Sequence, residues 1–424
     1  MENRAAHRTE NRRLVAAGMI GNVIEWYDFA LYGYMASIIS QLFFPSSDPT
    51  TSLIATYGAF AGGFLMRPVG AVFFGHVGDT IGRKPVMVLS VVLMVIPTIL
   101  LGLLPTYETW GLWAPLCLVL IRLVQGFSVG GEFSGSVTYL VEASRQDRRG
   151  LAGSWANCGG GIGFFMGAGT PALLIWLLGD TAIQEYGWRL PFLFGGVIGL
   201  IGLLLRSRLP ELGGETVGEE REIPLIRVFR EEPRVVVWML IFNIAYGAAY
   251  YVPIVYLPTW QSFYSDLSLD QALLIMTFAM AFQTVLIPIV GLATDTYLNR
   301  KRFLIFGFAM LGVLAYPFFR LAEGGEIWVV CLVYGVTCVF IAIMLGGVPA
   351  TLVEAFDRDH RLTGYSLSFN VGMAVGGGTA PVVCTALIQF FDFKYAPAVY
   401  LTLVCLLAAG ALVINKDRSK EPLR

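Results

Sequence analysis

Two carboxylic acids stand inside the first apolar stretch of the chain, which runs from residue 14 to residue 44. Glu25 and Asp28 are three residues apart, so on a helix they share one face. Glu25 would lie roughly 18 Å and Asp28 roughly 22 Å beyond Arg13, deep in a bilayer core about 30 Å thick. Charged groups at that depth are costly and usually functional. The pattern favours a site that takes up and releases a proton; the alternative is a buried salt bridge that only joins helices.

More charged residues fall in apolar stretches of the first half of the chain, namely Arg67, Arg122 and Glu132. Burial raises the pKa of a carboxylic acid and a nearby arginine lowers it, so a changing distance to an arginine would switch proton affinity. We therefore predict that Glu25 or Asp28 carries the proton, with Glu132 as the third candidate.

The composition is that of a polytopic membrane protein, since 56% of the 424 residues are hydrophobic and only 14% are charged. A soluble protein carries about 25% charged residues. Apolar segments long enough to span a bilayer predict an all-α protein of twelve transmembrane helices in two six-helix halves. They fall at 14–44, 53–75, 86–104, 113–142, 151–178, 188–206, 233–263, 270–293, 303–320, 326–353, 363–390 and 396–414.

The connections between these segments predict the domain organisation. Most of the 29 lysines and arginines lie in the two ends of the chain and in the even-numbered connections, which the positive-inside rule places in the cytoplasm. The expected parts are a cytoplasmic tail 1–13, a six-helix bundle 14–206, a cytoplasmic linker 207–232, a second bundle 233–414 and a cytoplasmic tail 415–424. No cleavable signal peptide is expected, because the first apolar run is too long.

The two halves carry related motifs about half a chain apart. Gly75 and Asp79 follow the second apolar segment, as Gly291 and Asp295 follow the eighth, and Val-Glu-Ala closes both the fourth and the tenth. Parallel six-helix repeats with a site at the midplane are a known transporter architecture.

Glycines four residues apart predict close helix crossings, which either serve packing alone or let helices slide. They are Gly126/Gly130, Gly131/Gly135, Gly159/Gly163/Gly167 and Gly372/Gly376.

At several motifs the sequence resembles the major facilitator superfamily, and within it the metabolite:proton symporter family. The stretch from Gly75 to Lys84 is similar to the superfamily loop signature, except that Thr80 replaces the usual basic residue. Its second copy has Leu298 and Asn299 where Gly and Arg are expected, which gives no support for a symmetric gating role of Asp295. The other motifs are Gly21-Asn22-x2-Glu25-Trp26-Tyr27-Asp28-Phe29, Phe64-Leu65-Met66-Arg67-Pro68, Arg122-x2-Gln125-Gly126 to Glu132, Trp188-Arg189-x-Pro191-Phe192, and Asn370 with Gly376-Gly377 and Pro381.

The resemblance implies proton-coupled import of a small solute by alternating access. Substrates of that family include organic acids such as α-ketoglutarate and citrate, shikimate, proline and betaines. We expect a functional monomer in the bacterial inner membrane, with no cofactor and no nucleic-acid partner.

The cytoplasmic gate is predicted at Asp79, Gly82, Arg83, Arg67 and Glu142, although Arg83 could serve only to set topology. Arg122 has a planar guanidinium that suits a substrate carboxylate. The alternative is that Arg122 neutralises Asp28 or Glu25, and it could also alternate between the two roles during transport. The predicted substrate-binding residues are Arg122, Tyr27, Gln125, Asn157, Tyr250, Tyr251, Gln283 and Asn370.

The sequence favours a transporter over two other classes of protein, an enzyme and a sensor. An enzyme is not expected, because the histidines (His7, His76, His360) lack metal-binding spacing and residues 78–84 lack that of a phosphate-binding loop. A sensor should carry a soluble output domain, and the longest polar stretch is the linker. Among transporters, uniport and antiport stay open as alternatives to symport.

Overall fold

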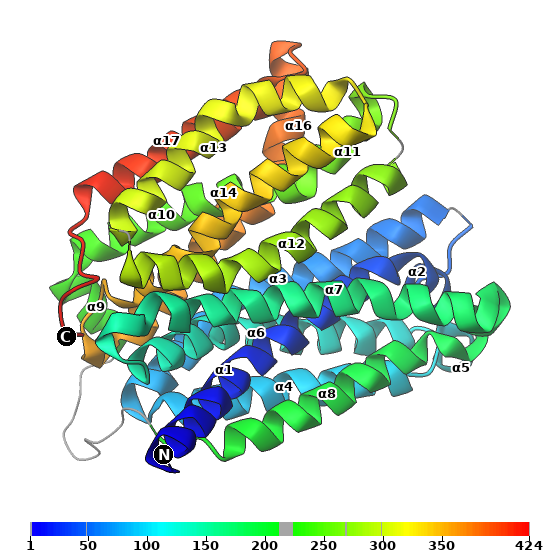
Figure 1. Ribbon diagram of the computed structural model, residues 1–424. Coiled ribbons are helices and arrows are strands. Elements are labelled where there is room, and N and C mark those ends of the chain that lie inside the picture. The colour runs from blue at the N-terminus through cyan, green and yellow to red at the C-terminus, as the bar shows by residue number, and fades with distance from the viewer. Residues whose placement is uncertain (1, 48, 212–223, 268, 298, 424) are drawn as a thin grey trace. The chain divides into compact units, whose positions relative to one another are not determined.

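The structure is a computed structural model that describes residues 2–47, 49–211, 224–267, 269–297 and 299–423 (Figure 1). Part of the predicted linker, 212–223, and the outermost residue of each predicted tail lie outside the described residues. Over the described ranges the chain is helical and contains no strand. This confirms the predicted all-α fold class.

Packing divides the chain into two compact units. Unit 1 comprises Met1–Ala143 and Gly159–Pro224, and unit 2 comprises Ser144–Cys158 and Leu225–Arg424. The helices of unit 1 are α1 (Glu2–Tyr34), α2 (Ala36–Phe43), α3 (Pro49–Thr80), α4 (Arg83–Leu103), α5 (Tyr107–Trp110), α6 (Trp113–Glu142), most of α7 (Arg149–Ala182), the π-helical turn η2 (Ile183–Gly187) and α8 (Arg189–Ser207).

Unit 2 contains the first ten residues of α7 and the second half of the chain. Its elements are η1 (Gln146–Arg148), α9 (Pro224–Glu231), α10 (Pro233–Tyr251), η3 (Val252–Tyr256), α11 (Leu257–Tyr264), α12 (Leu269–Thr296), α13 (Arg300–Glu323), α14 (Ile327–Val353), η4 (Arg358–His360), α15 (Arg361–Gly372), η5 (Met373–Gly378), α16 (Ala380–Phe391) and α17 (Ala396–Ile414). Helix α9 lies within the predicted linker, and α1 begins within the predicted N-terminal tail.

Ten helical stretches among the described residues are long and apolar enough to cross a membrane. The remaining two predicted spans lie in α1 and α3. Large apolar side chains such as Leu65, Trp176 and Val382 are exposed on the helices, as expected where lipid replaces water as the solvent. The chain is an integral, multi-pass membrane protein.

Close helix crossings position the charged residues of unit 1. A side-chain carbon on Gly126 would come within 1.9 Å of the Gly63 carbonyl oxygen, and one on Gly130 within 2.3 Å of the Arg67 carbonyl oxygen. Helices α3 and α6 can therefore touch backbone to backbone at these points, which brings Arg67 and Arg122 to the same part of the bundle. Gly163 meets α1 at the Val23 carbonyl in the same way.

An aromatic core fixes one end of α1 and α2. Trp188 is fully buried, with its ring edge-on to Phe43 at a centroid distance of 5.5 Å. The Tyr27 hydroxyl donates a hydrogen bond of 2.7 Å to the Pro191 carbonyl. The motif at residues 188–192 thus holds α8 against α1, the helix that carries the candidate proton carriers Glu25 and Asp28.

Candidate functional site

Asp28 and Arg122 form a buried ion pair between α1 and α6. Arg122 Nη1 lies 2.7 Å from Asp28 Oδ2, and both residues are less than 5% exposed. Asp28 Oδ1 also accepts hydrogen bonds from Gln125 Nε2 at 3.0 Å and from Thr98 Oγ1 at 3.1 Å. Three side chains from two helices therefore hold this carboxylate in place.

Much of the Arg122 guanidinium stays available. Its central carbon lies 3.6 Å from the centroid of the Tyr32 ring, which supports one face of the group. Within the part of the chain that the structure describes, its Nε and Nη2 atoms are buried and have no hydrogen-bond partner. A buried donor left unpaired costs about 1–3 kcal/mol, more when charged. The arrangement therefore favours binding of a second anionic acceptor.

Glu25 is held far more loosely than Asp28. Its nearest cation is Arg67, with Nη2 at 3.6 Å from Oε1, and no hydrogen bond to Oε2 is present among the described residues. Arg67 in turn lies over the rings of Phe64 and Phe29, at 4.5 Å and 5.2 Å from the centroids.

Both ion pairs line one pocket of unit 1. The predicted residues Glu25, Asp28, Arg67, Arg122 and Gln125 come together there. The full lining is Glu25, Asp28, Phe29, Gly63, Arg67, Met94, Arg122, Gln125, Gly126 and Val129. A pocket with two acids, two arginines and an amide suits a small ligand that carries a carboxylate.

Glu132 lies apart from this pocket in a pair of its own. Arg206 Nη1 and Nη2 reach its two carboxylate oxygens at 2.7 and 2.6 Å, and Ser90 donates a third hydrogen bond of 2.5 Å. Arg206 is 0% exposed and also binds the Ala17 and Met87 carbonyls. Arg206 is the last residue of the predicted first bundle, and it joins α8 to α1, α4 and α6.

We expect Glu132→Gln to lower stability strongly, by about 3–5 kcal/mol, because it leaves the buried Arg206 charge without its counter-ion. The measurement is the melting temperature of purified protein. The double variant Glu132→Gln/Arg206→Met should recover most of the loss, because no unpaired charge remains. A single variant that melts like the wild type but loses proton-driven accumulation would restore Glu132 as a proton carrier.

Of the predicted gate residues, Asp79, Arg83 and Glu142 form a charge cluster, whereas Arg67 lies in the pocket beside Glu25. Arg83 donates to Asp79 at 2.6 Å and to both oxygens of Glu142 at 3.2 Å. Gly82 precedes α4 with a φ of +137°, a conformation that side chains rarely adopt, and a side chain there would also meet Glu211. The arrangement ties together the ends of α3, α4 and α6.

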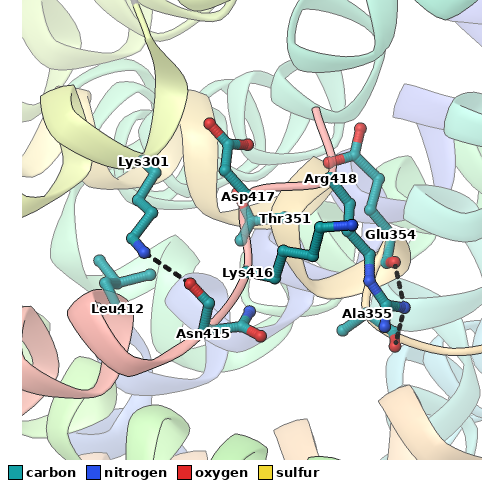
Figure 2. Close-up of a pocket in the computed structure, with 9 residues that line it drawn as sticks. All are labelled: Lys301, Thr351, Glu354, Ala355, Leu412, Asn415, Lys416, Asp417 and Arg418. Carbon is teal, nitrogen blue, oxygen red and sulfur yellow. Dashed lines mark hydrogen bonds between the residues drawn. The ribbon is translucent and has the colours of Figure 1, made fainter. Parts of the chain in front are cut away.

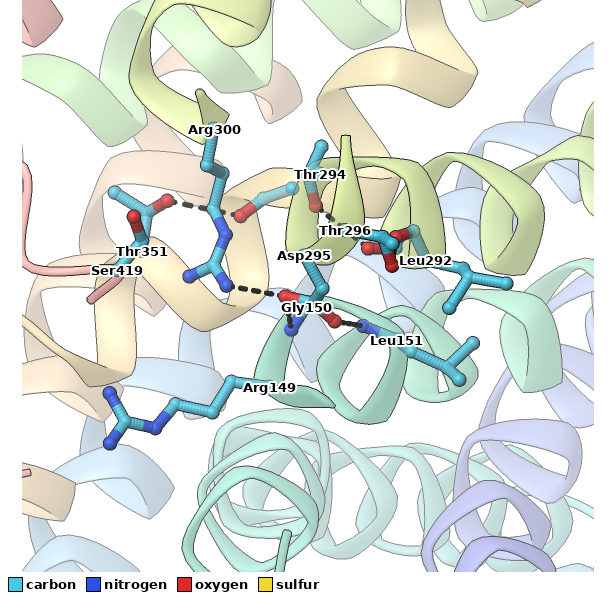
Figure 3. A network of polar contacts seen from close by, with 12 residues as sticks. Arg149, Gly150, Leu151, Leu292, Thr294, Asp295, Thr296, Arg300, Thr351 and Ser419 are labelled. Atoms are coloured by element: carbon cyan, nitrogen blue, oxygen red, sulfur yellow. Dashed lines mark hydrogen bonds and ion pairs between the residues drawn. The ribbon is translucent and has the colours of Figure 1, made fainter. Parts of the chain in front are cut away.

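Unit 2 contains the equivalent cluster, built around Arg300 (Figure 3). Figure 3 shows Arg300 beside Asp295, at 2.8 Å. Arg300 also lies 2.8 Å from Glu354. Asp295 also accepts hydrogen bonds of 2.8 Å from the backbone amides of Gly150 and Leu151 at the start of α7. Arg300 stands one residue after the position of the expected arginine, which Asn299 occupies. The arginine one position later was the feature of the sequence that could have indicated this pair, and Asp295 is paired with an arginine as Asp79 is in unit 1.

The other predicted substrate-binding residues lie elsewhere. The hydroxyl of Tyr27 is bonded to Pro191 and is not in the pocket. In unit 2, Asn157 donates to the Leu345 carbonyl at 2.8 Å, and Asn370 donates to the Ser366 carbonyl at 2.9 Å. The rings of Tyr250 and Tyr251 are 5.5 Å apart.

Unit 2 also buries polar atoms that lack partners among the described residues. They include both side-chain polar atoms of Asn243, the Tyr365 hydroxyl and Gln283 Oε1. Gln283 was predicted as a substrate residue, whereas Asn243 and Tyr365 were not. The feature of the sequence that could have identified them is a polar side chain inside an apolar helix.

Two helical units, each built of membrane-crossing helices, and a pocket lined by paired charges define a membrane transporter. A family model described as Major Facilitator Superfamily matches residues 18–282 and 264–424. The chain is 33% identical over 428 residues to the glycine betaine/proline/ectoine/pipecolic acid transporter OusA of Dickeya dadantii, covering 97% of this chain and 85% of that protein. It is 31% identical over 426 residues, with the same coverage, to the proline/betaine transporter of Escherichia coli.

Solved structures agree on the fold. The proton:xylose symporter XylE superposes with a TM-score of 0.76 at 16% identity, covering 98% of each chain. FucP in the outward conformation gives a TM-score of 0.70 at 12% identity, covering 95% of this chain and 97% of that one. The chain belongs to the Major Facilitator Superfamily, and within it to the family of the proline/betaine transporters. It is a transporter and not an enzyme.

Proposed function

We propose that this protein is a proton-coupled symporter that imports a small carboxylate-bearing metabolite, such as a zwitterion of the proline or betaine type. The observation that carries the proposal is the buried Arg122, which shares a pocket with two carboxylic acids and whose Nε and Nη2 atoms have no hydrogen-bond partner among the described residues. The relatives are named for proline and betaines, each of which carries a carboxylate.

Coupling follows from competition for one guanidinium. A substrate carboxylate that binds Arg122 competes with Asp28 for the same cation. Loss of that partner favours protonation of Asp28, and by linkage protonation of Asp28 favours binding of the substrate. The two solutes are then carried together, since each improves the binding of the other.

The same geometry ranks the three candidate carriers. Asp28 is the acid in direct contact with Arg122. Glu25 lines the same pocket but pairs with Arg67 at longer distance, so it is the second candidate. Glu132 is held by two bonds from Arg206 outside the pocket, which supports a structural role.

Alternating access requires a closure that can break. We propose that the Asp79–Arg83–Glu142 and Asp295–Arg300–Glu354 clusters hold the cytoplasmic side shut, because each joins helix ends through charge-assisted bonds. The basic residues of the two ends and the linker support a cytoplasmic location for both termini. The protein would act as a monomer in a bacterial inner membrane.

Uptake into proteoliposomes tests the proposal. With an inward proton gradient we expect accumulation of labelled proline or glycine betaine, by about tenfold for each pH unit if one proton is carried per substrate. Without the gradient, uptake should stop at equilibrium. Uptake that stops at equilibrium in both cases indicates uniport, and accumulation only with an outward proton gradient indicates antiport.

A further inference from the structure

A short segment follows α17 and runs across the charge cluster of unit 2. Its start is fixed by Lys301 of α13, whose Nζ donates to the Val413 carbonyl at 2.9 Å and to the Asn415 carbonyl at 2.6 Å (Figure 2). These bonds cap the end of α17, where carbonyl groups lack partners within the helix. We call residues 415–421 the strap.

The middle of the strap is bound to the end of α14. Figure 2 shows the Arg418 guanidinium turned toward the backbone next to Glu354. Its Nη1 donates to the Ala355 carbonyl at 3.0 Å. Ser419, the next residue, is only 6% exposed and lies beside the cluster around Arg300 in Figure 3. The strap is therefore packed on unit 2 through both side chain and backbone.

The end of the strap is bound to the residues that hold the start of α7. Lys420 Nζ donates to the backbone carbonyl of Asp295 at 3.0 Å. Gln146 Nε2 donates to the Lys420 carbonyl at 2.7 Å, and Arg149 Nη1 donates to the Glu421 carbonyl at 2.8 Å. Asp295 itself binds two amides of α7, as described above, and Arg149 also lies 3.3 Å from Glu354.

The position of these contacts along α7 gives them a mechanical consequence. Residues up to Cys158 of this helix belong to unit 2, whereas residues from Gly159 onward belong to unit 1. Because α7 continues into unit 1, a movement of unit 1 pulls on the start of this helix, which the bonds around residues 146–151 hold to the rest of unit 2. A segment that strengthens those bonds opposes the movement.

We propose that the strap is an intramolecular latch, which holds the start of α7 against Asp295 and slows opening of the cytoplasmic side. The mechanical role rests on the proposed alternating-access function, whereas the latching contacts do not. Opening requires release of Lys420 and Gln146 as well as the Asp295 bonds. The strap thus adds a third component to the two charge clusters.

Hydrogen–deuterium exchange of the full-length protein in lipid nanodiscs tests the latch directly. The variant Lys420→Ala removes the bond to Asp295, and Gln146→Ala removes the bond to the strap from the other side. In both variants we expect amide exchange over residues 149–157 to become about tenfold faster. Each variant loses one hydrogen bond of the latch, and a loss of that size shifts the local opening equilibrium by about this factor. The matched control is Lys416→Ala, because Lys416 is exposed and its ion pair with Glu421 stays within the strap.

Exchange in Lys420→Ala and Gln146→Ala that equals that of Lys416→Ala would overturn the proposal. Proton-driven uptake by the same variants separates this result from a failure of the proposed function. Faster exchange in protein that shows no proton-driven uptake supports the latch and contradicts the symporter. Unchanged exchange in protein that accumulates substrate contradicts the latch alone.

Discussion

Replacing Arg122 with lysine should weaken binding of the transported substrate by about ten- to a hundredfold, while the protein still folds. Lysine keeps the positive charge near Asp28 but loses the planar arrangement of N–H groups that can bind a carboxylate with two parallel bonds. Loss of one hydrogen bond to a charged group is worth about 1.5–3 kcal/mol, which gives that change in affinity. Binding is measured by calorimetry or by the substrate-induced rise in melting temperature.

The matched control for this variant is Arg189→Lys. Arg189 is a partly buried arginine of unit 1 that binds the Gly102 and Leu104 carbonyls and lies over the Trp188 ring, outside the pocket. Its replacement should change the melting temperature more than the affinity. If Arg122→Lys binds substrate as the wild type does, Arg122 is a structural counter-ion to Asp28 and the substrate is held elsewhere.

Replacing Asp28 with asparagine should abolish accumulation against a gradient and leave substrate exchange across the membrane. Asparagine preserves the size of the side chain and can still accept a bond from Arg122, but it cannot carry a proton. The accumulation ratio should therefore fall from about tenfold per pH unit to about one. Binding should also become less dependent on pH, because the competing carboxylate has been removed.

The informative comparison is Glu25→Gln, an amide variant of the other acid in the same pocket. We expect it to retain accumulation. Loss of accumulation in Glu25→Gln together with its retention in Asp28→Asn would assign the proton to Glu25. Normal accumulation and normal pH dependence in both variants would remove both acids from the coupling mechanism.

The sequence alone determined the fold class and the family, because both depend on patterns that are local along the chain. Apolar runs of spanning length follow from the thickness of the bilayer core. The predicted spans therefore agree with the observed helices to within a few residues, except that α1 begins at Glu2, within the predicted N-terminal tail. The glycines at four-residue spacing mark real crossings, since a side chain at Gly126 or Gly163 would collide with a neighbouring backbone. Charged residues in apolar spans likewise stand out in the sequence, because a charge inside the bilayer core is energetically unfavourable.

Only the tertiary structure determines which acidic residue pairs with which arginine. Arg206 and Glu132 are 74 residues apart in sequence, and nothing local indicates that α8 brings one to the other. The same is true of Arg300, which takes the place of an arginine missing from the expected position because the helix end brings its side chain to Asp295 and Glu354.

The segment after α17 is the clearest example of contacts that only the tertiary structure reveals. Its sequence is short, polar and charged, which is typical of a solvated tail. In the structure its backbone carbonyls accept bonds from Gln146 and Arg149, residues more than 250 positions away. Backbone groups are the same in every residue, so a contact made by them leaves no pattern in the sequence. Chemical type and helical periodicity can be read along the chain, whereas the partner of each charge depends on how the helices pack.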